Sequence, residues 1–542
     1  MFFLFVSTVF AQTRSQNYQL LLHSAAGISG DPKLHGKCGL PIFAALHQEV
    51  SKQPELAALF KAAFQRPQLP RSYVTPDGRF RFHYAVSGND AVDPTSTKVS
   101  GVPDYIYEAG QAAQISYDLL NNRIGFDPPM NDGGVDGAEY DFYVINEPAD
   151  RYGETAWDFI DASGRAPAYS FVDNDFTDYN TTGLAALQVT VAHEYFHGVQ
   201  LNYRFRQEDV FFLEMSSVWF EDFAYDEVND YYFYLRDFFN NPERSLHDTD
   251  GYEASIWLHY LAKRTRTVRI ILDLWKDIKL EPAIRSFKTV LESSPYSMPF
   301  IQAISEFNAW CYFTGARADS ARYFEEGANY PQIKFKRTVR VSSDSTINDG
   351  LSSVAANFYR VIRNPQNIQV VLQTGEPGRW MVTAISKNNQ QYTLQSGVGL
   401  APIDLPASLR EDTVVVAVVN TSLPLSNGQS VFSNYQLQVN LVGKLQIVNL
   451  LEKPRPNPFR GSGLLFFPFR LSQRTPVEAA ILREDGKVVR SFKLGELGAG
   501  VYSDKLFWDG HDASGNRVAS GVYFLQLVAG GFHEIAKFVV IN

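Results

Sequence analysis

The spacing of hydrophobic residues changes along this chain of 542 residues, and that change constrains the fold more than any other feature. Up to about residue 330 the chain mixes strand and helical periodicities, with strands early and helices late. From about 335 to 447 it becomes a series of short alternating strands separated by Gly, Asn, Pro and Ser. The same texture returns after the proline-rich segment 454–458. We therefore predict a multidomain protein in which an α+β domain precedes two all-β sandwich domains.

Five segments of the first domain have a clear periodicity. We predict strands at 80–86, 140–145 and 168–173, and helices at 106–120 and 181–204. Asn180 or Thr181 is available as the N-cap of the last helix.

Composition excludes several classes of protein. Hydrophobic residues make up 45% and charged residues 20%, which indicates a folded chain rather than a disordered one. The formal net charge is −10 and there is no basic block, so nucleic acid is not an expected partner. No apolar run approaches the ~18–20 residues that span a bilayer, so no transmembrane segment is predicted.

The N-terminal residues suggest export. Residues 1–11 form a short apolar run that ends in Val9-Phe10-Ala11, which is typical of a signal peptide cleaved after Ala11. The alternative is a buried N-terminal strand. Residues 12–70 could then be a pro-segment of the domain that extends to residue 334. Cys38 and Cys311 form one disulfide or remain two buried thiols. A single pair of cysteines does not distinguish the two possibilities.

The motif His193-Glu194-Tyr-Phe-His197 carries the clearest chemistry. Helical residues four apart lie on one face, so both imidazoles can reach a single metal ion. Glu194 would lie at the edge of that site, where a carboxylate can deprotonate a metal-bound water. Two histidines and a third protein ligand leave Zn²⁺ an open position, as in hydrolytic sites. The alternative is a helix that contains two histidines by chance.

Spacing restricts the third ligand. A metzincin site would need a histidine six residues after His197, where this chain has Tyr203, and no aspzincin-type downstream motif is present. The next helical segment offers Glu214 and Glu221, which are seven residues apart and therefore share a face. One can bind the metal while the other supports a histidine from behind. Spacing alone does not determine which of the two glutamates binds the metal.

These residues resemble the gluzincins, the metallopeptidase class of thermolysin and aminopeptidase N. In that class the third ligand is a Glu on the next helix, followed three residues later by a small residue, as Glu214 is followed by Ser217. The resemblance implies a thermolysin-like domain with Glu214 as ligand and Glu221 as a supporting residue or alternative ligand. The segment that follows Asp248 resembles the helix that carries a transition-state tyrosine, which would be Tyr252. Alternatively, Tyr252 is a core residue at the start of a helix.

The same resemblance implies, less specifically, that residues 168–173 form the edge strand that pairs with an extended substrate. Its substrate-binding residues would be Ala168, Tyr169, Ser170 and Phe171. Residues 70–330 also resemble a little-characterised family of secreted bacterial proteins grouped as metalloproteases. The Asp- and Gly-rich loop 127–141 suits Ca²⁺ as a second ion, and a solvated turn is the alternative.

The last residues, 448–542, resemble the FlgD-like immunoglobulin module that serves as a sorting domain in type IX secretion. The likeness rests on Trp508-Asp-Gly510 and on Ser520-Gly-Val-Tyr523. It implies transport to the cell surface or the medium through the type IX secretion machinery. A passive sandwich stalk is the alternative.

Together these observations predict a secreted zinc metallopeptidase that acts on a protein or peptide substrate. No Gly-x-Met-x-Asn anchor for a free N-terminus is visible, which favours an endopeptidase. The competing hypothesis is a cell-surface binding or adhesion protein with a degenerate peptidase domain.

Overall fold

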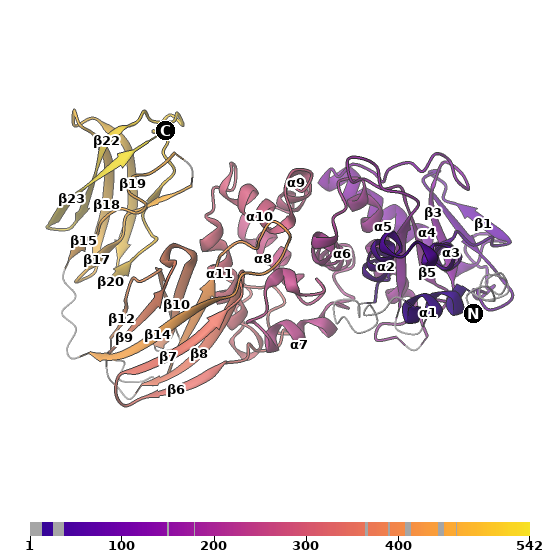
Figure 1. Ribbon diagram of the computed structural model, residues 1–542, viewed down its shortest axis with the longest axis horizontal. Helices are drawn as coiled ribbons and strands as arrows, with labels where there is room; N and C mark the ends of the chain where they lie inside the picture. Colours follow the sequence, from indigo (N-terminus) through magenta and orange to yellow (C-terminus); the bar gives the residue numbers. More distant parts are fainter. Residues whose placement is uncertain are drawn as a thin grey trace.

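The structure, a computed structural model, describes residues 14–24, 37–148, 151–177, 179–363, 367–388, 391–406, 413–442, 449–461 and 463–541. The predicted signal peptide at 1–11 lies outside these residues. Figure 1 shows an elongated molecule that begins in a region of strands and helices, continues through a helical region, and ends in two β regions.

A five-stranded sheet in the order β1-β2-β3-β5-β4 organises the first region. Its strands are β1 (Arg71–Val74), β2 (Phe80–Tyr84), β3 (Tyr140–Ile145), β4 (Gly153–Trp157) and β5 (Ala168–Asp173). β2, β3 and β5 run parallel, whereas β1 and β4 pair antiparallel with their neighbours. Every residue of β5 is buried, as expected for an interior strand of a covered sheet.

This order corrects the predicted substrate edge strand. Residues 168–173 form a strand as predicted, but β3 occupies one side of it and β4 the other. Ala168, Tyr169, Ser170 and Phe171 therefore have no free edge to offer a substrate. The sheet ends on this side at β4, whose first residue, Gly153, pairs with Cys38. Burial on both faces of the strand, as in β5, is typical of an interior strand.

Two long helices cover the sheet. α4 (Asp104–Tyr117) packs on β2 and continues as one π-helical segment, η4 (Asp118–Ile124), while α5 (Gly183–Leu201) packs on β4 and β5. The predicted cap of α5 differs from the observed one. Thr182 precedes the helix and makes no side-chain cap, whereas the Thr181 hydroxyl donates to Asp230.

The remaining helices flank this layer or continue away from it. Before the sheet lie α1 (Arg14–Ser24), α2 (Leu40–Lys52) and α3 (Ala57–Phe64). After it lie α6 (Val210–Ala224), α7 (Tyr232–Asn240), α8 (Ile256–Thr265), α9 (Arg269–Asp277), α10 (Ala283–Glu292) and α11 (Phe300–Tyr312). In the part of the chain that the structure describes, no helix combines the length and hydrophobicity needed to cross a bilayer.

The middle region is a sandwich of two sheets, ordered β11-β10-β13-β8-β6 and β12-β9-β14-β7. Its strands are β6 (Arg337–Val341), β7 (Ser345–Leu351), β8 (Ala355–Arg363), β9 (Asn367–Thr374), β10 (Trp380–Asn388), β11 (Gln391–Val398), β12 (Ile403–Leu405), β13 (Thr413–Asn420) and β14 (Ser433–Val442). The facing surfaces of the two sheets enclose a core that includes Trp380, Val416 and Leu437.

The sandwich does not stand apart from the helices. α11 packs on the outer face of β10 and β13 (Figure 1). Met381, Val415 and Val419 therefore belong to the core of the first region, while Val414 and Val416 belong to the sandwich core. The predicted boundary near residue 334 thus does not separate two independent cores.

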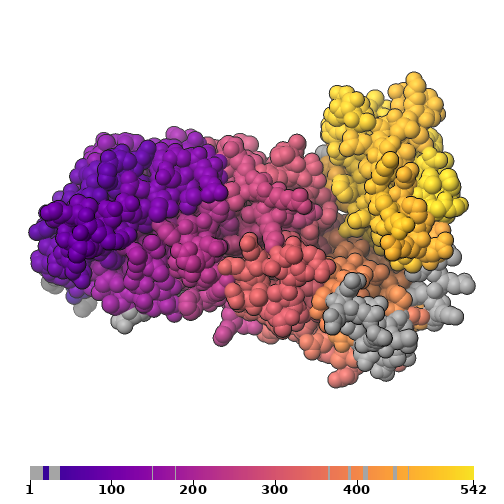
Figure 2. All heavy atoms as spheres, turned by 180° about the vertical axis from the view of Figure 1, so that it is seen from behind, coloured from indigo at the N-terminus to yellow at the C-terminus, as the bar shows by residue number. Residues whose placement is uncertain are grey.

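The C-terminal region has a core of its own, centred on Phe459, Trp508 and Phe538. Its strands are β15 (Leu450–Leu451), β16 (Leu465–Phe466), β17 (Phe469–Leu471), β18 (Thr475–Arg483), β19 (Val488–Leu497), β20 (Gly500–Tyr502), β21 (Phe507–Trp508), β22 (Gly521–Ala529) and β23 (Phe532–Val540). Figure 2 shows this region as a separate lobe on the surface.

Candidate metal centre

α5 places His193, Glu194 and His197 in the buried interior between the sheet and α6. Fifteen of its nineteen residues are buried, which includes both histidines and Glu194. The helix is apolar on nearly every side, so it is a central helix rather than a surface one. Because His193 and His197 are one turn apart, their imidazoles face the same point, and their Nε2 atoms lie 3.0 Å apart.

α6 brings Glu214 to that point. One carboxylate oxygen of Glu214 lies 3.2 Å from His193 Nε2, and the other lies 3.3 Å from His197 Nε2. In a tetrahedral zinc site with bonds of ~2.0–2.1 Å, neighbouring N and O ligand atoms are separated by ~3.3 Å. The observed spacing of the three side chains therefore fits a zinc-sized ion without rearrangement.

The geometry separates Glu214 from Glu221, which sequence spacing could not do. Glu221 lies behind His193, with Oε1 2.5 Å from Nδ1, the nitrogen that points away from Glu214. A carboxylate in this position holds the ring orientation and leaves Nε2 free to bind a metal. Glu214 thus has the position of a ligand and Glu221 that of a supporting residue.

His197 is oriented by a residue that the sequence analysis missed. Gln200 Oε1 lies 2.8 Å from His197 Nδ1, and the Gln200 amide donates to the Leu213 carbonyl and the Ser217 hydroxyl. Gln200 therefore accepts the Nδ1 proton and leaves Nε2 facing Glu214. Its position, one turn after His197, was the signal available in the sequence.

The charges around the histidines also suit a cation. Burial would lower the pKa of His193, but its hydrogen bonds to Glu214 and Glu221 outweigh that effect and raise the pKa to about 10. Burial would raise the pKa of Glu214, but His197 and His193 lower it to about 2. Glu214 Oε1 is buried and makes no hydrogen bond. Positive charge at this point therefore stabilises the two carboxylates: protonated His193 and Lys37 supply it in the metal-free protein, and a divalent ion would supply it when bound.

Glu194 lies beside the ligand atoms and faces the sheet. Its Oε2 accepts a hydrogen bond of 2.6 Å from the Thr155 hydroxyl on β4. Burial raises the pKa of the Glu194 carboxyl. A carboxyl group with a raised pKa is suited to exchange a proton near neutral pH.

Tyr252 also belongs to the centre. Its ring stacks on His193 at 5.9 Å between centroids, and the side chain is fully buried. Gly251 makes this approach possible: its φ is +101°, and a Cβ there would lie 2.2 Å from the Phe211 carbonyl oxygen at the start of α6. Tyr252 is therefore held against the ligand set by a turn that only glycine can form at this distance.

A fourth candidate ligand, Cys38, comes from far away in the sequence. Cys38, His193, His197 and Glu214 each offer one ligand atom, and these four atoms lie within 4.8 Å of one another. Cys38 and Cys311 are both free and buried, which is the second of the two alternatives that the sequence left open. The placement of Cys38 beside the histidines was not predicted.

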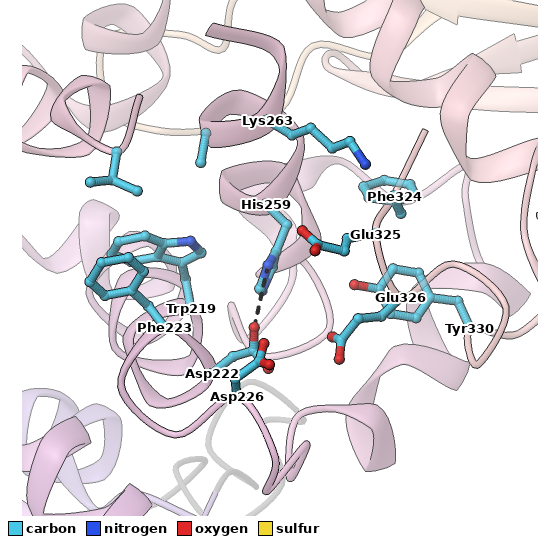
Figure 3. A pocket seen from close by; sticks show the side chains of 12 residues that line it. Trp219, Asp222, Phe223, Asp226, His259, Lys263, Phe324, Glu325, Glu326 and Tyr330 are labelled. Carbon is cyan, nitrogen blue, oxygen red and sulfur yellow. Dashed lines mark ion pairs between the residues drawn. The ribbon is translucent and has the colours of Figure 1, made fainter. Parts of the chain in front are cut away.

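An acidic pocket lies on another face of α6. Figure 3 shows Asp222, Asp226 and Glu326 near one another in a cavity of about 290 Å³, which His259 also lines. His259 Nδ1 is 3.7 Å from Asp222. Burial and the neighbouring acids raise the pKa of Asp222 to about 8, and burial lowers that of His259 to about 4. The sequence analysis did not single out this pocket.

The loop predicted as a Ca²⁺ site has a different arrangement. Its Asp132 and Asp141 carboxylates both bind Arg66, at 2.8 and 3.1 Å, and Asp136 accepts a hydrogen bond from Tyr143. Among the described residues, those of this loop form no group of three close ligand atoms. An arginine thus occupies the acidic groups that a cation would need.

Comparison with known proteins identifies the end of the chain. The family described as the FlgD Ig-like domain matches residues 468–531, which confirms the module expected there. The basal-body rod modification proteins FlgD of Salmonella typhimurium and Salmonella typhi are each 37% identical to this chain over 75 residues. These matches span 13% of this chain and 32% of each relative, so the chain covers about a third of their length.

Solved structures give weaker likenesses. PorZ, a surface component of the type-IX secretion system of Porphyromonas gingivalis, is 21% identical over 20% of this chain and 14% of its own, with a TM-score of 0.14. Dimeric latent PorU from the same organism is 13% identical over 39% of this chain and 19% of its own, with a TM-score of 0.15.

Proposed function

We propose that the protein is a secreted zinc-dependent peptidase, an endopeptidase of protein or peptide substrates. One observation carries this proposal: the two imidazole Nε2 atoms lie 3.0 Å apart and each lies 3.2–3.3 Å from an oxygen of Glu214, beside a buried glutamate that is not needed as a ligand. His193, His197 and Glu214 would hold the ion. A structural zinc site does not require a carboxylate such as Glu194 beside its ligands.

Glu194 has the position of the general base. Bound Zn²⁺ supplies a Lewis acid that polarises a carbonyl and lowers the pKa of water to ~7. Glu194 would accept a proton from the attacking water and deliver it to the leaving amine. The Thr155 hydroxyl fixes one carboxylate oxygen, so the other is the one that exchanges the proton.

Tyr252 would stabilise charge on the substrate oxygen. Its ring stacks on His193, and its hydroxyl lies beside Glu214 and accepts a hydrogen bond from the Cys38 backbone amide. A phenol held in this way can donate to a developing oxyanion once that amide is gone. The edge of β4, rather than β5, would pair with the backbone of an extended substrate once residues 37–39 have left it.

The decisive experiment replaces Glu194 by Gln. We expect near-stoichiometric zinc in both proteins and cleavage of a peptide library by the wild type only, abolished by a chelator. Glu484→Gln, a change in the C-terminal lobe, is the control and should leave cleavage unchanged. Cleavage retained by Glu194→Gln would refute the assigned base.

We also propose that the C-terminal lobe directs export through the type IX secretion machinery to the cell surface or the medium. The match of residues 468–531 to the FlgD Ig-like family supports this, together with the resemblance of the Trp508 and Ser520 motifs to sorting domains. Truncation after residue 442 should leave the protein inside a type IX-secreting host cell. Unchanged export of the truncated chain would argue against the role.

A surface binding or adhesion protein with a degenerate peptidase domain is the second candidate. It is favoured by the complete burial of the ligand set, which leaves no substrate access while residues 37–39 are in place. Absence of zinc from the purified protein, together with absence of cleavage by any form of it, would favour this candidate.

A further inference from the structure

The segment Lys37-Cys38-Gly39 lies across the metal centre, although it comes more than 150 positions before His193 in the chain. The Cys38 side chain joins His193, His197 and Glu214 in one group of four ligand atoms within 4.8 Å. Thiolate sulfur is a preferred zinc ligand, and a set of four protein ligands closes a tetrahedral site. Nothing in a hydrolytic centre calls for a fourth protein ligand.

The backbone of this segment also occupies the edge of the sheet. The Gly39 amide donates to the Gly153 carbonyl at 2.9 Å, and the Tyr152 amide donates to the Lys37 carbonyl at 2.8 Å. Cys38 therefore pairs with Gly153 as a short extra strand beside β4. These are the hydrogen-bonding groups that an extended substrate would need.

Two further contacts hold the segment. Lys37 is buried, and its ammonium group lies 2.5 Å from both Glu221 and Asp230. The Cys38 amide donates to the Tyr252 hydroxyl at 2.9 Å. A single short segment thus contacts the ligand set, the supporting Glu221, the sheet edge and Tyr252.

From these contacts we infer that residues 37–39 form an autoinhibitory plug, in which the Cys38 thiolate is the fourth ligand of the metal. This inference rests on the proposed function. Activation is a ligand exchange: the sulfur leaves, water takes its place, and the thiolate takes up a proton from solvent, with no change of oxidation state. The segment can leave after cleavage of the connection 65–70, which has no helix or strand, joins α3 to β1 and exposes Gln65, Gln68 and Pro70.

Gly39 offers a way to displace the plug without touching a ligand. A Cβ at this position would lie 2.6 Å from Glu154 Cγ, and Glu154 is itself held by Arg151 at 2.6 Å. Gly39→Ala should therefore unseat the segment. Gly378→Ala is the matched control, because a Cβ there meets nothing within 4 Å.

The test loads the full-length protein with Co²⁺ and records the sulfur-to-cobalt charge-transfer band. We expect this band in the wild type and in Cys311→Ser, and its loss in Cys38→Ser. Gly39→Ala should weaken it and Gly378→Ala should not. A wild-type cobalt protein without the band would overturn the inference.

Peptidase activity then separates a plug from a permanent ligand. Cys38→Ser and Gly39→Ala should cleave peptides at least ~10-fold faster than the wild type, as expected if the closed form exceeds nine-tenths of the population. A Cys38-dependent band with no gain in cleavage in either variant, while wild-type cleavage remains, would show a permanent ligand and refute the plug. If no form cleaves peptides but the band is present, the proposed peptidase function fails and the ligation by Cys38 stands.

Discussion

Glu221→Gln tests the support of the metal centre with almost no change in side-chain volume. In the structure, one oxygen of Glu221 faces His193 Nδ1 and the other faces the Lys37 ammonium, each at 2.5 Å. Both partners are donors, and a carboxylate can accept from both. Glutamine has one acceptor oxygen and one donor NH₂ group, so it can satisfy only one of the two.

The size of the effect follows from these two contacts. Loss of a supporting partner of a metal-binding histidine typically lowers metal affinity about 10–100-fold, which is about 1.4–2.8 kcal/mol. A hydrogen bond to the Lys37 ammonium is worth about 1.5–3 kcal/mol, so we expect the one acceptor oxygen of the glutamine to stay with Lys37 and its NH₂ group to face His193 Nδ1. We therefore expect weaker zinc binding with little change in the stability of the metal-free protein.

The assay is equilibrium competition for zinc against a chromophoric chelator, with urea unfolding of the metal-free protein in parallel. Asp222→Asn, at the neighbouring position on α6, is the control and should leave zinc affinity unchanged. Zinc affinity within about threefold of the wild type would refute the supporting role. A loss as large as that of Glu214→Gln would instead make Glu221 a ligand.

Two further outcomes follow from the described contacts. Tyr252→Phe should bind zinc normally and lower kcat about 10²–10³-fold in protein freed of residues 37–39, measured by steady-state kinetics, and an unchanged kcat would exclude Tyr252 from the transition state. The pKa of Asp222 is raised to about 8, so the folded protein keeps a proton on this group that the unfolded chain releases near pH 4. The contribution of Asp222 to stability is therefore complete below pH 4 and is lost as the pH rises toward 8. Urea unfolding of Asp222→Asn between pH 5 and 9 should show a flatter decline than the wild type, and parallel curves would contradict this.

Local patterns predicted the helix that carries the two histidines, but not all of the residues that contact them. The i, i+4 histidines placed two imidazoles on one face, since helix geometry alone determines that relation. The choice between Glu214 and Glu221 depends on how α6 is rotated against α5, which is a packing property. Cys38 could not be placed at all, because its contact with the centre joins segments that are distant in sequence.

In the sheet, too, local sequence predicted a strand but not its neighbours. The strand at 168–173 was predicted from its apolar run, but its place in the interior depends on β4, whose residues 153–157 carry no clear periodicity. The consecutive valines of β13 are buried on both faces. That unbroken run indicated a sheet covered on each side, which the predicted free-standing sandwich did not take into account.

The packing of α11 on β10 and β13 has a practical consequence for anyone who wishes to produce the first region by itself. A fragment that stops at residue 334 would expose the face of α11 that packs on β10 and β13. The sandwich alone would expose Met381, Val415 and Val419 to water. Either piece would be prone to precipitate. The shortest fragment expected to stay in solution runs through Val442, the last residue of β14, and omits only the terminal lobe.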